Sequence, residues 1–282
     1  EVAVRKYNMH LSRVVRGSSR NTSECRTVPA WLTNDNTMFR VQCGIADIDS
    51  YSMLFYGNYM RYNERAANAC LSQSDGQGGC AMLKAAHFVK YTMPVRWNDV
   101  VDVRSTLLGE PKEHEATLLQ EWLVEGRVIH ACYATYKLHN VATGMPSAML
   151  PDKAATRRVM VMDKEPKMAF EAGESFTAGG LVTPDMINFR SQLSVSTIVD
   201  MMERRRTDML GGQAELERLQ KEEGVAVCAY IMQDMELHAT PVLPGDALEV
   251  ASGYYVQNDM FYCYHHTLKH QSTGRLISGG QP

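Results

Sequence analysis

The sequence lacks the motifs of several common enzyme classes. It contains no Gly-rich phosphate loop, no HExxH and no G-x-S-x-G, so kinase, zinc-protease and serine-hydrolase functions have no support. Its seven cysteines are odd in number and include no CxxC pair, which argues against a zinc site and a complete disulfide framework. We therefore expect reduced thiols in an intracellular compartment and no bound metal. No separate cofactor is predicted.

Long apolar runs and a strong charge of one sign are absent as well. No run approaches the ~18 apolar residues that a spanning helix needs, so no membrane span is predicted. The net charge of -3 over 282 residues provides no overall basic field for nucleic acid. Hydrophobic residues make up 45% and charged residues 22%, which is typical of a soluble globular protein.

Residues 1–37 are predicted to be a basic N-terminal extension. The stretch 1–26 carries six Arg or Lys residues against two Glu residues. An Arg- and Ser-rich, acid-poor start is typical of organelle targeting and predicts a mitochondrial location. Two alternatives remain open for this extension. It packs on its own domain as an extra strand or arm, or it docks on a partner such as RNA or an acidic neighbour.

The chain contains an internal repeat. Three pairs of segments resemble each other in the same order: 63–71 with 202–210, 93–105 with 240–252, and 138–144 with 268–274. The number of residues between the two members of a pair differs only modestly from pair to pair, as changes in loop length would produce. Three collinear matches indicate two copies of one structural unit.

Each copy has the pattern of one helix followed by long strands. Helices are expected around 53–72 and 192–221. Period-two alternation predicts strands at 87–95, 100–109, 116–126 and 128–140, and again at 226–242, 247–258 and 261–271. Contiguous strands after a single helix indicate an antiparallel sheet wrapped on that helix, and so an α+β fold. The domains are predicted at 1–37 (extension), 38–150 (copy one), 151–167 (linker) and 168–282 (copy two).

Residues 47–66 carry a distinctive series of side chains. It runs Asp47-Ile48-Asp49, then Leu54-Phe55-Tyr56-Gly57-Asn58-Tyr59, then Asn63-Glu64-Arg65-Ala66. With the strand signal at 94–103, this series resembles the hot-dog fold of acyl-CoA and acyl-carrier-protein thioesterases, and most of all the 4-hydroxybenzoyl-CoA thioesterase branch. The resemblance covers 38–150 well and 168–282 more faintly. Tandem copies are similar to the plant-type acyl-carrier thioesterases and imply a double hot-dog, an internal pseudo-dimer.

The resemblance implies a catalytic carboxylate at Asp49. A thioester hydrolase needs a nucleophile or general base and donors for the developing oxyanion. The free N–H groups of the first helical turn, at Tyr56 and Gly57, point where such donors are needed. Gly57 is expected to let the backbone approach the thioester closely. Asp47 is expected to support the loop, and Asp49 as a simple helix cap is the structural alternative.

Four further residues are weaker candidates. Tyr59 and Glu64 are predicted to support the site, with a core aromatic and a surface ion pair as their respective alternatives. Arg204 and Arg205 are candidates for binding coenzyme A phosphates, although a charge run on a helix is usually a solvated face.

Departures from the family pattern leave a second function open. Ser52 replaces a glycine that is usual in the loop, and Tyr56 stands where many relatives have His. Asn188 occupies the place of Asp49 in copy two, so copy two is expected to be inactive and to complete the acyl pocket between the copies. The alternatives are thus a thioester hydrolase, or a catalytically silent subunit of a large assembly such as a mitochondrial ribosome. A monomer and a homo-oligomer both remain open.

Overall fold

The computed structural model describes residues 38–49, 52–71, 79–112, 114–146, 176–224, 231–257 and 261–279. The basic extension at 1–37 and the linker at 151–167 lie outside these ranges, so the predictions for them stay predictions. We call the described elements up to residue 146 the first half and those from residue 176 onward the second half.

The first half contains one helix and five strands within the described residues. Its elements are β1 (Met38–Gln42), a 3₁₀ helix (Ile45–Asp47), α1 (Tyr56–Leu71), β2 (Gly79–Tyr91), β3 (Val100–Lys112), β4 (Glu115–Val124) and β5 (Arg127–Asn140). The helix and the β3 to β5 strands agree with the predicted segments. The sequence pattern missed β1, a short strand at the edge of the sheet.

The second half repeats this order with one added helix. Its elements are β6 (Phe176–Leu181), a 3₁₀ helix (Pro184–Met186), α2 (Val195–Met209), α3 (Gln213–Glu223), β7 (Ile231–Leu237), β8 (Ala247–Gln257), β9 (Phe261–His270) and β10 (Leu276–Gly279). The prediction of a single helix over 192–221 is wrong. Gly211 and Gly212 have φ values of 98° and 83°, which end α2 and start α3 in a new direction.

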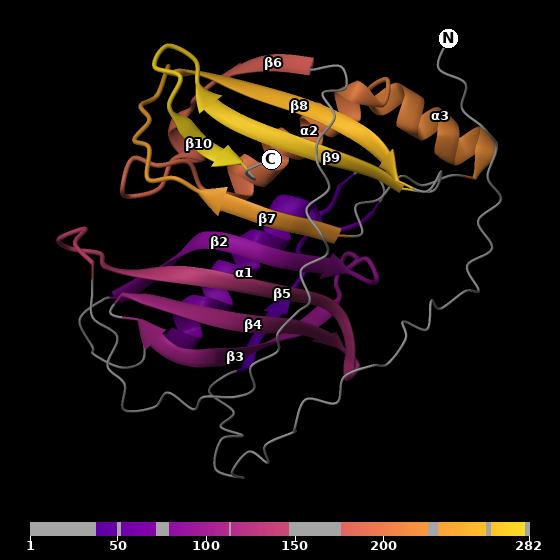
Figure 1. Ribbon diagram of the computed structural model, residues 1–282. Coiled ribbons are helices and arrows are strands. Elements are labelled where there is room, and N and C mark those ends of the chain that lie inside the picture. The colour runs from indigo at the N-terminus through magenta and orange to yellow at the C-terminus, as the bar shows by residue number, and fades with distance from the viewer. Residues whose placement is uncertain are drawn as a thin grey trace.

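Within the described residues, all the strands form one antiparallel sheet of ten strands in the order β1-β3-β4-β5-β2-β7-β10-β9-β8-β6. The halves meet where β2 pairs with β7. Figure 1 shows α1 behind the strands of the first half and α2 behind β8 and β9. The two helices also contact each other, so the halves join both through the sheet and through the helices.

The core under α1 combines apolar packing with a closed polar network. Trp122 and Tyr136 are fully buried, as is most of the inner face of α1. The Trp122 indole N–H donates to Asn63 Oδ1 at 2.7 Å, and Gln120 donates to the Asn63 carbonyl at 2.8 Å. The Tyr136 hydroxyl donates to Gln120 Oε1 at 2.5 Å. These bonds pair the polar groups that the packing of α1 removes from water.

Two of the three predicted segment pairs occupy equivalent places. α1 and α2 follow equivalent loops, and the turns before β3 and β8 have the same hydrogen bonds. In these turns the Asp99 and Asp246 carboxylates accept the N–H three residues earlier, at 2.8 and 2.7 Å. The third pairing is wrong: 138–144 follows β5, whereas 268–274 joins β9 to β10. Both segments are Gly-closed turns at strand ends, which explains the sequence similarity.

Candidate active site

Asp47 ties the loop before α1 to the helix. Its Oδ2 accepts hydrogen bonds from the Tyr62 hydroxyl at 2.6 Å and from the Gly44 N–H at 3.1 Å. Its Oδ1 forms an ion pair with Arg61. Its backbone carbonyl accepts two more bonds, both 3.0 Å, from the start of α1. These bonds engage both oxygens of the Asp47 carboxylate and join the loop to α1, and the supporting role of Asp47 in a reaction stays a prediction.

Asp49 holds a tight turn that also occurs in the second half. Its N–H donates to the Met53 carbonyl at 2.7 Å, and its Oδ1 accepts the Met53 N–H at 3.0 Å. Asn188 makes the same pair of bonds with Gln192, at 2.8 and 3.2 Å. The turn therefore needs a side-chain oxygen at this position but no negative charge. These bonds go to Met53 in the turn before α1, which differs from the helix cap that was the structural alternative for Asp49.

Ser52 lies in a backbone conformation that favours glycine. Its φ is 60°, and the equivalent Ser191 has a φ of 54°. This left-handed region is costly for a residue with a Cβ, which fits the glycine expected in this loop.

Replacing Ser52 by Gly is expected to stabilise the protein by about 1 kcal/mol, because the left-handed conformation no longer carries the Cβ penalty. Chemical denaturation at neutral pH measures this change. Ser191→Gly is the matched control in the second half and should give a gain of similar size. A loss of stability in Ser52→Gly would show that the serine side chain contributes more than its backbone conformation costs.

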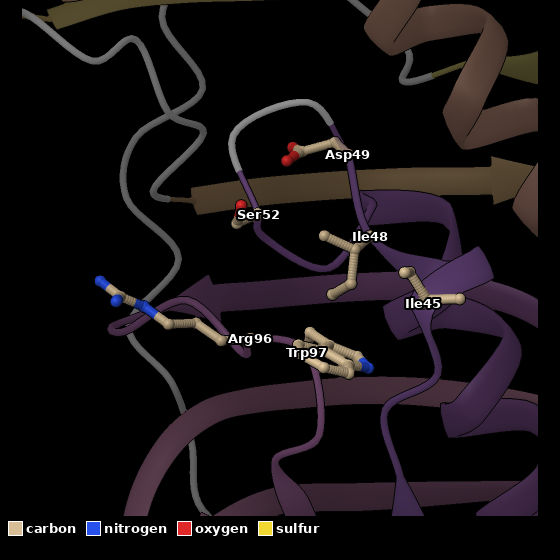
Figure 2. Close-up of a pocket in the computed structure, with 6 residues that line it drawn as sticks. All are labelled: Ile45, Ile48, Asp49, Ser52, Arg96 and Trp97. Atoms are coloured by element: carbon tan, nitrogen blue, oxygen red, sulfur yellow. The ribbon is translucent and has the colours of Figure 1, made fainter.

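Asp49 borders a hollow of about 450 Å³. The other residues that line it are Ile45, Ile48, Ser52, Arg96 and Trp97 (Figure 2). Trp97 is 62% exposed and Ile45 is 76% exposed, so this apolar wall is open to solvent. Figure 2 shows the Asp49 carboxylate directed toward the side on which Ser52 and Arg96 lie, away from Ile45 and Trp97. All these residues belong to the first half, whereas we expected a pocket between the copies.

Gly57 lies against α2. A Cβ added to Gly57 would lie 2.6 Å from the Ser196 carbonyl oxygen and 2.8 Å from Asp200 Cγ, so no larger residue fits without movement. We expected this glycine to admit a thioester. In the structure it admits the second helix instead, and the two helices approach each other at their first turns.

The tyrosines of α1 lie in an aromatic cluster. The Tyr59 hydroxyl accepts the Val95 N–H at 3.1 Å, and its ring is 2% exposed, which fits the core alternative. The Tyr56 ring packs edge-on against Tyr91 at 4.9 Å. The Arg206 guanidinium from α2 lies 5.5 Å from the centre of the Tyr56 ring. The start of α1 thus carries contacts to both the first-half sheet and α2.

Two acidic residues of α2 join the same region. Burial raises the pKa of Glu203, its ion-pair partner Arg206 lowers it, and the charges of Asp200 and Asp49 raise it further. Asp49 therefore acts electrostatically across the contact between the halves. In the sequence, Glu203 matches Glu64 only through the repeat, and no motif marks Asp200. The apolar Phe55 before α1, where a capping residue is usual, is the signal for an acceptor from another element.

Comparison with known proteins identifies the fold. No family model and no curated protein matches the sequence. An acyl-ACP thioesterase from Bacteroides thetaiotaomicron superposes with a TM-score of 0.61 over 86% of this chain and 94% of that chain, at 11% identity. The 12:0-ACP thioesterase from Umbellularia californica gives a TM-score of 0.58 over 86% and 92%, at 13% identity. This chain has a hot-dog thioesterase-like fold.

Within this hot-dog fold, Glu64 hydrogen-bonds to strand β2 and does not line the hollow. Its Oε1 accepts the Leu83 N–H of β2 at 2.9 Å, and burial raises its pKa to about 7. One turn later, Asn68 bonds both the N–H and the carbonyl of Ala81, at 2.7 and 2.8 Å. Both side chains bond to backbone groups in the part of β2 that extends beyond its pairing with β7. The surface ion pair that was the alternative for Glu64 is not what the structure shows.

The arginines of α2 do not share one face of this hot-dog fold. Arg204 is exposed, the Arg205 side chain is 13% exposed and lies 3.7 Å from Asp208, and Arg206 is buried. None of them lines the hollow beside Asp49. Only Arg204 is therefore placed to meet a phosphate from solvent.

Two classes of site have no counterpart in the part of the chain that the structure describes. No group of three or more His, Cys, Asp or Glu side chains there is arranged to hold a metal ion. None of the helices there combines the length and the apolar character that crossing a membrane requires.

Proposed function

We propose that this protein is a thioester hydrolase of tandem hot-dog type that acts on an acyl-CoA or acyl-carrier-protein substrate. The observation that carries the proposal is the ionisable side chain of Asp49. Asn188 shows that the turn needs only an oxygen acceptor there, yet the first half has a carboxylate beside an open hollow. A carboxylate at such a place can activate water or attack a carbonyl directly.

The order of elements supports a double hot-dog. β1, the 3₁₀ helix, α1 and four strands are followed by β6, a second 3₁₀ helix, α2 and four strands. The isolated bridge Ile48↔Leu54 before α1 has its counterpart in Ile187↔Leu193 before α2. In this arrangement the second half has Asn188 in place of the carboxylate and packs α2 against Gly57 at the start of α1.

The proposed mechanism uses residues of this chain alone. Asp49 takes a proton from water as the water oxygen attacks the thioester carbonyl, and the N–H groups of Tyr56 and Gly57 receive the oxyanion. The carbon–sulfur bond then breaks, and the thiolate leaves with the proton from Asp49. Coenzyme A takes part only as a portion of the substrate, and Arg204 is the side chain that we propose for its phosphates.

The proposal is tested by thioester hydrolysis over a series of acyl-CoA chain lengths, followed through thiol release. We expect turnover above that of heat-denatured protein for at least part of the series, with KM falling as the chain lengthens against the apolar wall of the hollow. The same rate as the denatured sample at every chain length, and with acyl-carrier substrates, would contradict the proposal.

The contact of Gly57 with α2 favours a second candidate function. The backbone that should receive the oxyanion is packed against Ser196 and Asp200. A thioesterase-like subunit without activity, held in a large assembly such as a mitochondrial ribosome, needs the fold but no access to this backbone. Its docking element would be the basic stretch within 1–37, with RNA or an acidic protein as partner. Turnover that depends on Asp49 excludes this candidate.

A further inference from the structure

Helix α1 begins without a capping residue of its own. The residue before it is Phe55, whose side chain has no acceptor. At the equivalent place before α2, the Ser194 hydroxyl oxygen accepts the Thr197 N–H at 3.3 Å. A cap normally serves the second or third N–H of a helix, so α1 needs an acceptor from elsewhere.

Asp200 of α2 lies where that acceptor is needed. Gly57 is the second residue of α1, and the Asp200 Cγ lies 2.8 Å from the point that a Cβ on Gly57 would occupy. Asp200 Oδ1 is buried without a partner on its own helix, and the Gly57 N–H is the backbone donor that faces this carboxylate. The carboxylate is thus held against the start of α1 by the contact between the two helices.

The pKa of Asp200 is raised overall, and three neighbouring groups limit that rise by favouring its charged form. Burial raises the pKa of Asp200, and Arg204, the N–H of Gly57 and Arg61 each lower it. Two of these three come from α1 itself. An anion at a helix N-terminus is favoured by the unpaired N–H groups and by the helix dipole.

We infer that Asp200 caps α1 across the interface between the halves, and that its carboxylate occupies the place at which the Gly57 N–H would receive a thioester oxygen. The first part stands on the geometry alone. The second part rests on the proposed function: hydrolysis then requires Asp200 to withdraw, and the second half controls access to the first-half site.

The cap is tested by giving α1 a serine cap like that of α2. Asp200→Ala should lower Tm by roughly 2–4 °C, the effect of losing one helix cap in a protein of this size. Phe55→Ser, which copies Ser194, should restore most of that loss in the double variant and should change the wild-type Tm little. Asp208→Ala is the matched control, because this aspartate of the same helix is 59% exposed and its ion-pair partner is Arg205 of α2. An Asp200→Ala protein as stable as wild type, or one that Phe55→Ser does not rescue, would overturn the cap.

The second part, that Asp200 occupies the position of the thioester oxygen, is tested by measuring turnover in proteins that carry Phe55→Ser. We expect Phe55→Ser/Asp200→Ala to exceed Phe55→Ser in kcat/KM by about 10-fold or more, because one oxyanion donor is worth roughly 10²–10³ in kcat. The gain should vanish when Asp49→Asn is added. Unchanged turnover together with rescued stability overturns the occupancy and leaves the cap and the proposed function standing. Rescued stability with no turnover in any variant overturns both the occupancy and the proposed function, and again supports the cap.

Discussion

Replacing Asp49 by Asn is expected to lower kcat by about 10²–10⁴-fold, the usual contribution of a general base or acid. The amide keeps the Oδ1 that accepts the Met53 N–H, as Asn188 does for Gln192 in the second half. The turn should therefore stay intact while the proton acceptor is lost. Steady-state hydrolysis of the best substrate in the chain-length series measures the effect, and KM should change much less than kcat.

The second half provides the controls for this substitution. Asn188→Asp places a carboxylate in the equivalent turn before α2, which does not line the hollow beside Asp49, and should leave kcat unchanged. Thermal unfolding of Asp49→Asn should coincide with that of wild type. Full activity in Asp49→Asn would remove Asp49 from the mechanism. A large drop in Tm would mean that the charge is needed for folding.

Acidification from pH 7 to pH 4 is expected to destabilise the native state by about 3 kcal/mol through His130 alone. His130 is fully buried among the rings of Tyr59, Tyr91 and Trp122, and burial lowers its pKa to about 3. In the unfolded chain the pKa returns to its usual value near 6.5, so between pH 6.5 and pH 3 the unfolded state binds the proton. Stability from this group is complete above pH 6.5 and falls as the pH falls toward 3.

The measurement is the unfolding free energy of wild type and of His130→Phe at both pH values. The phenyl ring fits the aromatic surroundings and cannot titrate, so the variant should lose about 3 kcal/mol less than wild type.

Two other groups titrate in the same pH range. Glu64 opposes the effect of His130, because its raised pKa of about 7 adds stability as the pH falls. Burial lowers the pKa of His266 to about 4 and adds to the effect. Both groups are present in both proteins and cancel in the comparison. Equal losses in the two proteins would show that His130 has access to solvent.

The contact between α1 and α2 is the feature on which the two candidate functions divide. Asp200 and Glu203 place two carboxylates of α2 at this contact, Arg206 pairs with Glu203, and the charge of Asp49 also acts on Glu203. An enzyme can use this contact to place α2 beside the backbone N–H groups proposed for the oxyanion. A structural subunit can use the same contacts to lock its halves together. Turnover in the Asp49 and Asp200 variants distinguishes these uses, whereas the fold is the same in both.

The sequence by itself determined the helix at 56–71, the alternating strands and the equivalence of Asp49 with Asn188. These follow from local rules: the side-chain period of a helix or strand, and turns that require an Asx oxygen or a left-handed residue. It did not determine β1, β6 and β10, because strands of four to six residues leave little pattern. It also placed one helix where Gly211 and Gly212 separate two.

The tertiary structure alone decided what faces the start of α1. The sequence identified Gly57 as a residue that permits close approach, but the approaching group depends on how the two halves pack. That group is Asp200, which is 143 positions away in the chain and whose own surroundings in the sequence indicate only a helix face. Packing depends on many weak contacts between residues that are distant in the sequence. A local pattern such as Gly57 can therefore indicate that another group packs closely there, but only the tertiary structure shows which group it is.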